Sequence, residues 1–181
     1  MDFLSKLENT IFEWFKSLPD LPAGGRKWLG DNIWWIALIG AILTALGVLG
    51  TLTALASLVS LFGTVAATYY ATSSVTTWAI VTGVVGLVFS ILELLLLAFA
   101  IKPLKEKQKK GWVLLFATWL LGGFAVIVNA ILSLSIIGFI FGVLFGAIWV
   151  AISGYFLFEI HGQFAHVQRS AGVKKGVKVT K

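Results

Sequence analysis

Four long apolar runs constrain this chain more than any other feature. They span residues 33–62, 78–101, 112–132 and 136–160, and each is long enough to cross a hydrocarbon core of about 30 Å as an α-helix. Hydrophobic residues make up 59% of the chain and charged residues 12%, which is unlike an ordinary soluble domain. The sequence therefore predicts an all-α, polytopic membrane protein with four transmembrane helices.

The links between the runs predict how the helices are arranged. The link around Ser133 and Ser135 is so short that the third and fourth spans must form an antiparallel hairpin. We expect an antiparallel four-helix transmembrane domain over residues 33–160. Residues 1–32 would then form an amphipathic helix and linker on the cytoplasmic face, and residues 161–181 a basic cytoplasmic tail.

The first segment has an amphipathic pattern. Apolar residues fall on one stripe at helical spacing, and Phe12 is the bulky residue off the stripe; the stripe holds Phe3, Leu4, Leu7, Ile11, Trp14, Phe15 and Leu18. Pro19 and Pro22 predict the end of this helix before the membrane begins. Acidic residues mixed through the segment argue against a cleaved signal peptide, so we expect residues 2–18 to lie in the plane of the interface.

Lysine and arginine are confined to the two terminal segments and to the loop 102–111. The positive-inside rule then places both termini and this loop in the cytoplasm, and the lysine bias favours a bacterial inner membrane. We expect contact with anionic lipid headgroups from Lys102, Lys105, Lys107, Lys109, Lys110, Arg169, Lys174 and Lys175.

Two polar residues lie inside the spans. Glu93 is near the middle of the second span, where a carboxyl group serves either as a proton or cation site or as a hydrogen-bonded group in helix assembly. Asn129 lies deep in the third span, and a hydrogen bond to Thr or Ser of another helix is its expected role.

Small residues recur along two spans. Gly138, Gly142, Gly146 and Gly154 share one face of the fourth span, a spacing that allows close approach of another helix. The first span has a second small-residue face that includes Gly40 and Gly47, and the two faces are able to meet. The spacing leaves open whether the partner helix belongs to the same chain or to another subunit.

Catalytic and metal-binding patterns are sparse. The chain has no cysteine, and the common nucleotide-binding, hydrolase and zinc-protease motifs do not occur. Glu159, Gln163 and His166 would share one helical face, whereas His161 points elsewhere, so the group is a poor metal site. We expect no enzyme, cofactor, resident metal or nucleic-acid partner; catalysis on lipid by Glu159, His161 or His166 ranks last.

Aromatic and basic anchors in the second half carry a resemblance. Lys110-Gly111-Trp112, Leu114-Leu115-Phe116 and Gly154-Tyr155-Phe156-Leu157-Phe158 resemble the boundary segments of small, uncharacterised four-helix bacterial integral membrane proteins. That family has no assigned activity. The topology is also similar to that of claudins and tetraspanins, but their cysteines and large extracellular loops are missing.

The sequence favours a non-catalytic function. We expect a structural or accessory subunit, or a self-assembling helical bundle, whose partners are lipid, other membrane-protein subunits or copies of itself. The alternative is a small oligomeric ion channel or transporter that uses Glu93 in the membrane.

Overall fold

The computed structural model describes residues 2–15, 17–61, 74–133 and 135–165, and this part of the chain is built from helices. Four of the helices are long and apolar enough to cross a membrane, which indicates an integral membrane protein. The helices are α1 (Asp2–Phe15), α2 (Ala23–Leu61), α3 (Ser74–Lys105), α4 (Lys109–Leu132), α5 (Ile136–Glu159) and α6 (His161–Ala165).

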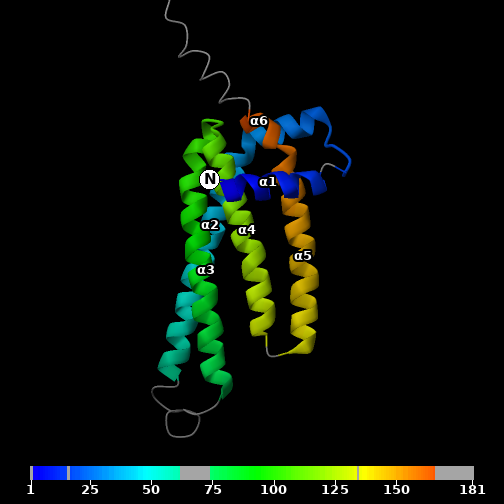
Figure 1. Cartoon of the computed structure of the whole chain (residues 1–181). Helices are drawn as coiled ribbons and strands as arrows, with labels where there is room; N and C mark the ends of the chain where they lie inside the picture. Colours follow the sequence, from blue (N-terminus) through cyan, green and yellow to red (C-terminus); the bar gives the residue numbers. More distant parts are fainter. Residues whose placement is uncertain (1, 16, 62–73, 134, 166–181) are drawn as a thin grey trace, which may run out of the picture.

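The four long helices pack in the order in which they occur along the chain. α2 packs on α3, α3 on α4 and α4 on α5, while α1 lies across α4 and α5 near one end of the bundle (Figure 1). α2 and α5 do not form an extensive contact. The two small-residue faces expected from the sequence therefore do not pack against each other.

Helix ends differ from the sequence-based boundaries. α2 begins at Ala23, before the first apolar run, and α3 continues past Pro103 to Lys105. α3 ends in a Schellman motif, in which Gln108 N–H donates to Pro103 O (2.8 Å) and Lys107 N–H to Leu104 O (3.0 Å). Lys107 has a φ of 54° at the position where glycine is usual. This tight turn leads directly into α4 at Lys109.

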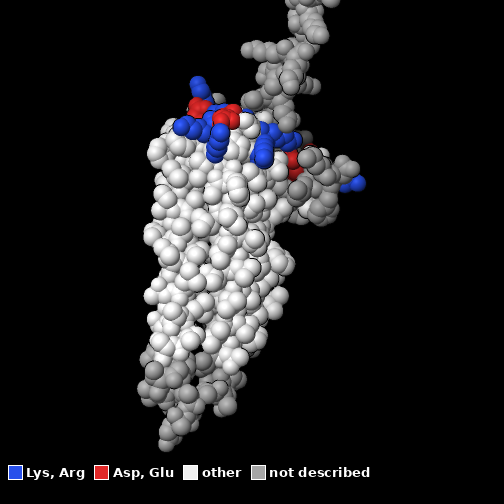
Figure 2. Space-filling view, turned by 90° about the vertical axis from the view of Figure 1, so that its left-hand side faces the viewer, with Lys and Arg blue, Asp and Glu red and all other residues white. Residues whose placement is uncertain are grey.

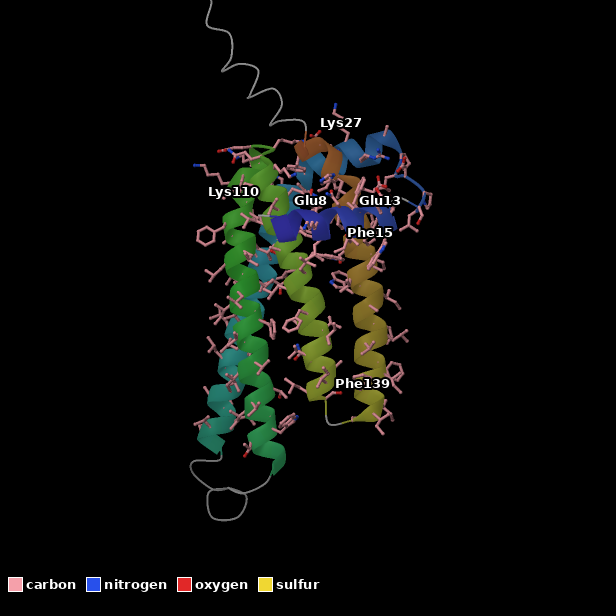
Figure 3. The ribbon with its side chains drawn as sticks, in the orientation of Figure 1. Glu8, Glu13, Phe15, Lys27, Lys110 and Phe139 are labelled. Carbon is pink, nitrogen blue, oxygen red and sulfur yellow. The ribbon has the colours of Figure 1, made fainter. Side chains whose placement is uncertain are left out.

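The charged residues mark one end of the bundle, which we call the charged end. Figure 2 shows lysines, arginines and acidic residues gathered there, with an uncharged surface along the rest of the visible face. In Figure 3, Lys27 and Lys110 project from this end and Phe139 lies at the opposite end. The buried apolar residues also gather here, and the largest that are fully buried are Trp112, Phe116, Phe164, Leu104 and Ile160.

The glycine face of α5 packs on α4 of the same chain. A Cβ built on Gly142 would contact Ala130 at 3.7 Å, and one on Gly146 would overlap Val126. Gly138 faces the link at Ser133, and Gly154 faces Trp119 of α4 together with Phe15 of α1. Within the chain, the glycine face is thus turned toward α4.

Small residues on α2 have a different environment. A Cβ on Gly40 would contact Leu97 of α3 at 3.7 Å, whereas one on Gly47 would have no described atom within 4 Å. Gly40 thus contributes to packing between α2 and α3. The surface around Gly47 is open in the described part of the chain.

Candidate functional site

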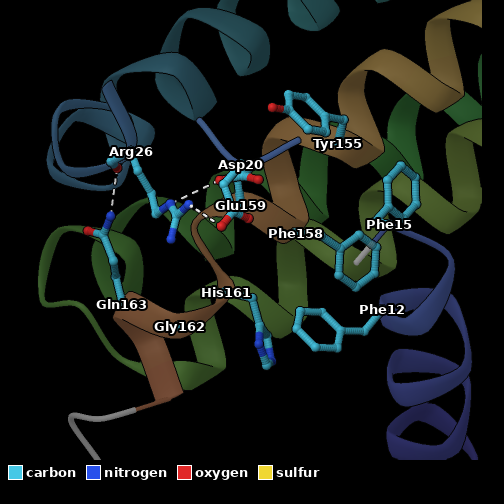
Figure 4. Close-up of a pocket in the computed structure, with 10 residues that line it drawn as sticks. All are labelled: Phe12, Phe15, Asp20, Arg26, Tyr155, Phe158, Glu159, His161, Gly162 and Gln163. Atoms are coloured by element: carbon cyan, nitrogen blue, oxygen red, sulfur yellow. Dashed lines mark hydrogen bonds and ion pairs between the residues drawn. The ribbon is translucent and has the colours of Figure 1, made fainter. Parts of the chain in front are cut away.

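Polar side chains from distant parts of the sequence surround one cavity at the charged end. This cavity, which we call the charged-end pocket, has a volume of about 470 Å³ and lies between α1, residues 17–22, the start of α2 and the junction of α5 with α6 (Figure 4). Its volume falls within the range of small-ligand sites, and aromatic and polar groups both line it. It is lined by Phe12, Phe15, Asp20, Arg26, Tyr155, Phe158, Glu159, His161, Gly162 and Gln163.

Arg26 joins three segments at this pocket. Its Nε lies 2.9 Å from Glu159 Oε2, and its Nη2 lies 3.4 Å from Asp20 Oδ2. The Glu159 side chain is 10% exposed and that of Asp20 is 81% exposed. The Arg26 carbonyl accepts a hydrogen bond of 2.6 Å from Gln163 Nε2. Because a buried carboxylate needs a partner, Arg26 stabilises Glu159 and holds the start of α2 against α5 and α6.

A second ionic contact attaches α1 to the bundle. Glu8, which is buried, lies 2.6 Å from Nε2 of His161 and 3.6 Å from Nζ of Lys109. The three residues come from α1, α6 and α4. The apolar stripe predicted for this helix does not include Glu8, and the burial of Glu8 shows that the packed face of α1 also contains a carboxylate.

Aromatic rings form the apolar wall of the pocket. Phe15 stacks on Phe158 with ring centroids 5.1 Å apart, and Phe12 lies 5.4 Å from the ring of His161. Figure 4 shows Phe12 and Phe15 directed from α1 toward Phe158 of α5. Phe12, off the predicted stripe, therefore packs inward, whereas Trp14 on that stripe is 70% exposed. The packed face of α1 is rotated relative to the predicted one.

The predicted helical face at the end of α5 is interrupted. α5 ends at Glu159 and α6 begins at His161. Glu159 and Gln163 nevertheless both contact Arg26, Glu159 at the guanidinium and Gln163 at the backbone carbonyl. His166 lies outside the described residues. Among the described residues, no three His, Asp or Glu side chains lie close enough together to hold a metal ion.

The intramembrane candidates are far from this pocket. Glu93 is half-buried on α3, and no side-chain or backbone partner is seen for it among the described residues. Asn129 is exposed and donates to Ala125 O of its own helix at 2.8 Å. The expected hydrogen bond from Asn129 to another helix is therefore replaced by one within α4.

The lysines of the loop differ in their contacts. Lys102 and Lys110 are exposed, whereas Lys105 lies over the ring of Trp34 at 4.9 Å and Lys107 is paired with Asp31. Lys109 contacts Glu8 as described above. Three of the loop lysines therefore have protein partners, while Lys102 and Lys110 are open to headgroups. Arg169, Lys174 and Lys175 lie outside the described residues.

Sequence reasoning missed Asp20 and Arg26, which line the pocket, and Glu8, which contacts the lining residue His161. Glu8 is spaced three, four and seven residues before Ile11, Phe12 and Phe15, so it shares their helical face; that spacing is a detectable signal. Arg26 and Asp20 occur in a segment that the sequence identified as a linker. Their meeting with Glu159 depends on the fold, and local spacing contains no signal for it.

The pocket is suited to binding charged groups. Its described lining residues include two carboxylates, a guanidinium and three phenylalanine rings, but no Ser, Thr or Cys nucleophile. Such a set holds polar ligands by ionic hydrogen bonds and apolar ones by ring contacts. Comparison with protein-family models, with curated proteins and with solved structures finds no match for this chain.

Proposed function

We propose that this chain is a non-catalytic integral membrane protein that acts by packing against other membrane components, as an accessory subunit or as a homo-oligomer. In this proposal α2 to α5 form an antiparallel bundle, α1 lies in the plane of the interface, and the charged end with both termini faces a bacterial cytoplasm. The exposed Lys102 and Lys110 would contact anionic lipid headgroups.

The surface of α5 is the observation that carries this proposal. No residue from 136 to 153 is buried, although this stretch belongs to a helix that is apolar enough to span a membrane. Phe145 and Trp149 are 63% and 71% exposed. Because α4 is the long helix against which α5 packs, most of the α5 surface is available to lipid or to helices of other subunits.

Cross-linking from single cysteines tests the proposal, since the chain has no cysteine of its own. We expect Trp149→Cys on α5 to form cross-linked species in native membranes, with another copy or with a different protein. Leu46→Cys, at a site on α2 that is 59% exposed, is the comparison variant, because α2 also packs on one long helix and has an exposed face of its own; stronger cross-linking of Trp149→Cys than of Leu46→Cys would place the assembly surface on α5. The mass of the complex in mild detergent would identify the species.

Two results together would contradict assembly through α5. They are a monomeric mass in mild detergent and equal, background-level cross-linking of the two cysteine variants. Co-purification at a fixed ratio with other proteins would support an accessory subunit, and a defined multiple of the chain mass would support a homo-oligomer.

A second candidate function depends on Glu93. A half-buried carboxyl group without a described partner in the apolar part of a span is a feature of proton and ion pathways. The alternative proposal is an oligomeric channel or transporter. Reconstituted protein should then show ion or proton flux that falls with Glu93→Gln and is retained in Asn129→Leu. Flux unchanged by Glu93→Gln would remove this role.

A further inference from the structure

The charged-end pocket contains a hydrogen-bond donor group and acceptor oxygens that the described residues do not fully use. Nη2 of Arg26 donates to the Leu21 carbonyl and lies 3.4 Å from Asp20 Oδ2. The buried Nε of Arg26 lies 2.9 Å from Glu159 Oε2 but makes no hydrogen bond with the described residues, and none is seen for Nη1 either. Oδ2 of Asp20 and Oε2 of Glu159 are the carboxylate oxygens that face Arg26. A second oxygen of each carboxylate is left to accept hydrogen bonds.

The charges of this set favour a zwitterionic ligand. A simple anion at Nη1 of Arg26 would lie beside two carboxylates, and a simple cation at those carboxylates would lie beside the guanidinium. His161 does not change this balance, because its Nε2 is already 2.6 Å from Glu8. A group that has a negative and a positive end a few bonds apart can satisfy both sides of the pocket.

The apolar wall indicates that the ligand also has a hydrophobic part. Phe12, Phe15 and Phe158 line the same cavity as Arg26 and Asp20. Trp14 and Leu18, on the adjoining part of the chain, are exposed apolar residues, as expected where a protein meets the lipid headgroup region. The cavity is thus polar on one side and aromatic on the other, at the boundary between the apolar spans and the charged end.

We propose that the charged-end pocket binds one phospholipid with a phosphoethanolamine headgroup. The phosphate would accept hydrogen bonds from Nη1 of Arg26, and the ammonium would donate to Asp20 and to the second oxygen of Glu159. The glycerol and the first acyl carbons would pack on Phe12 and Phe15. A primary ammonium fits these acceptors better than choline, which has no N–H to donate.

Native mass spectrometry of the full chain, released from mixed micelles with defined lipids, tests this proposal. We expect one phosphatidylethanolamine per chain to be retained about tenfold more than phosphatidylcholine or phosphatidylglycerol, as the loss of one charged hydrogen bond implies. Asp20→Asn should abolish this preference and raise the retention of phosphatidylglycerol. Glu106→Gln, which removes a carboxylate at the same end but outside the pocket, should retain the wild-type preference.

A second pair of variants tests the phosphate side. Arg26→Gln should lower the retention of phosphatidylethanolamine about tenfold, and Lys27→Gln, which removes the neighbouring positive charge, should have little effect. If Arg26→Gln does not fold, the wild-type selectivity and Asp20→Asn still decide the matter, because Asp20 is 81% exposed.

Three outcomes would overturn the proposal. Equal or greater retention of phosphatidylglycerol by the wild-type protein would show an anion site. Equal retention of phosphatidylcholine would show that the carboxylates do not select an ammonium. Displacement of the lipid by soluble phosphoethanolamine at comparable concentration would assign the pocket to a soluble phosphorylated amine rather than to a membrane lipid.

Discussion

The two ends of the helical bundle are held together in different ways. At the charged end, α1 to α6 all contribute to one cluster of buried side chains, centred on Trp112, Phe116 and Phe158. Toward the opposite end, a single described apolar residue, Ala130, is buried. Packing there relies on glycines and on few side-chain contacts. The charged end therefore has the features of a soluble core, whereas the other end depends on lipid and close helix approach.

This contrast indicates where the stability of the chain resides. Apolar side chains facing lipid gain little by packing, because lipid tails are as apolar as Leu. Fully buried aromatic residues at the charged end lose contacts and leave a cavity when they are truncated. Stability should thus be concentrated at the charged end.

The largest expected effect comes from removing the centre of the aromatic cluster. The Trp112 side chain is 0% exposed, and its Nε1 donates to Leu157 O at 3.0 Å. Trp112→Ala should lower the free energy of unfolding by about 3–5 kcal/mol. The free energy of unfolding can be measured by denaturation in SDS, monitored by circular dichroism. Trp149→Ala, at a residue 71% exposed, is the matched control, and equal losses in both variants would remove the contrast between the two ends.

A smaller effect is expected where the turn after α3 touches α4. A Cβ on Gly111 would lie 2.5 Å from the backbone nitrogen of Leu104, and backbone cannot move aside as a flexible side chain does. Gly111→Ala should lower the free energy of unfolding by about 1–3 kcal/mol, and the same denaturation assay measures this loss.

The control for this variant lies on the same helix. A Cβ on Gly122 would have no described atom within 4 Å, so that Gly122→Ala should be neutral or stabilise α4 by up to about 1 kcal/mol. A loss of stability in Gly122→Ala that matches that of Gly111→Ala would show that close packing at the turn is not the cause.

The smallest effect is expected at the end opposite the charges. Nε1 of Trp78 on α3 donates to Leu132 O at the end of α4, over 2.7 Å. Trp78→Phe removes this hydrogen bond but retains a ring, and the expected loss is about 0.6 kcal/mol. Trp149→Phe is the reference in the same assay. A loss above that of Gly111→Ala would show that this end is stabilised more strongly than its sparse core implies.

The spans were predictable because an uninterrupted apolar run has few alternatives to a membrane helix. The four runs predicted from the sequence fall within α2, α3, α4 and α5 apart from a terminal residue: the first run extends to residue 62, and α5 ends at Glu159. The start of α2 was missed because Gly24 and Gly25 are poor helix formers. The segment is nevertheless helical, and its first turns pack through Arg26 on Glu159 and Gln163.

The site was much less predictable than the spans. The small-residue face of α5 indicated a close helix contact, but spacing alone could not identify α4 as its partner. Glu8 shares a helical face with Ile11, which local periodicity can reveal, but its contact with His161 joins residues 153 positions apart. The charged-end pocket depends on such long-range contacts, and a single sequence contains little information about them.

The placement of α1 has a consequence for how the chain is made. A ribosome synthesises α1 first, yet α1 rests on α5 and α6, the last helices in the described part of the chain. Lys109 and Trp119 of α4 are synthesised earlier, but the contacts of Glu8 with His161 and of Phe15 with Phe158 can form only once α5 and α6 have been made. Docking of the first helix is therefore completed late in biogenesis, after the fourth span.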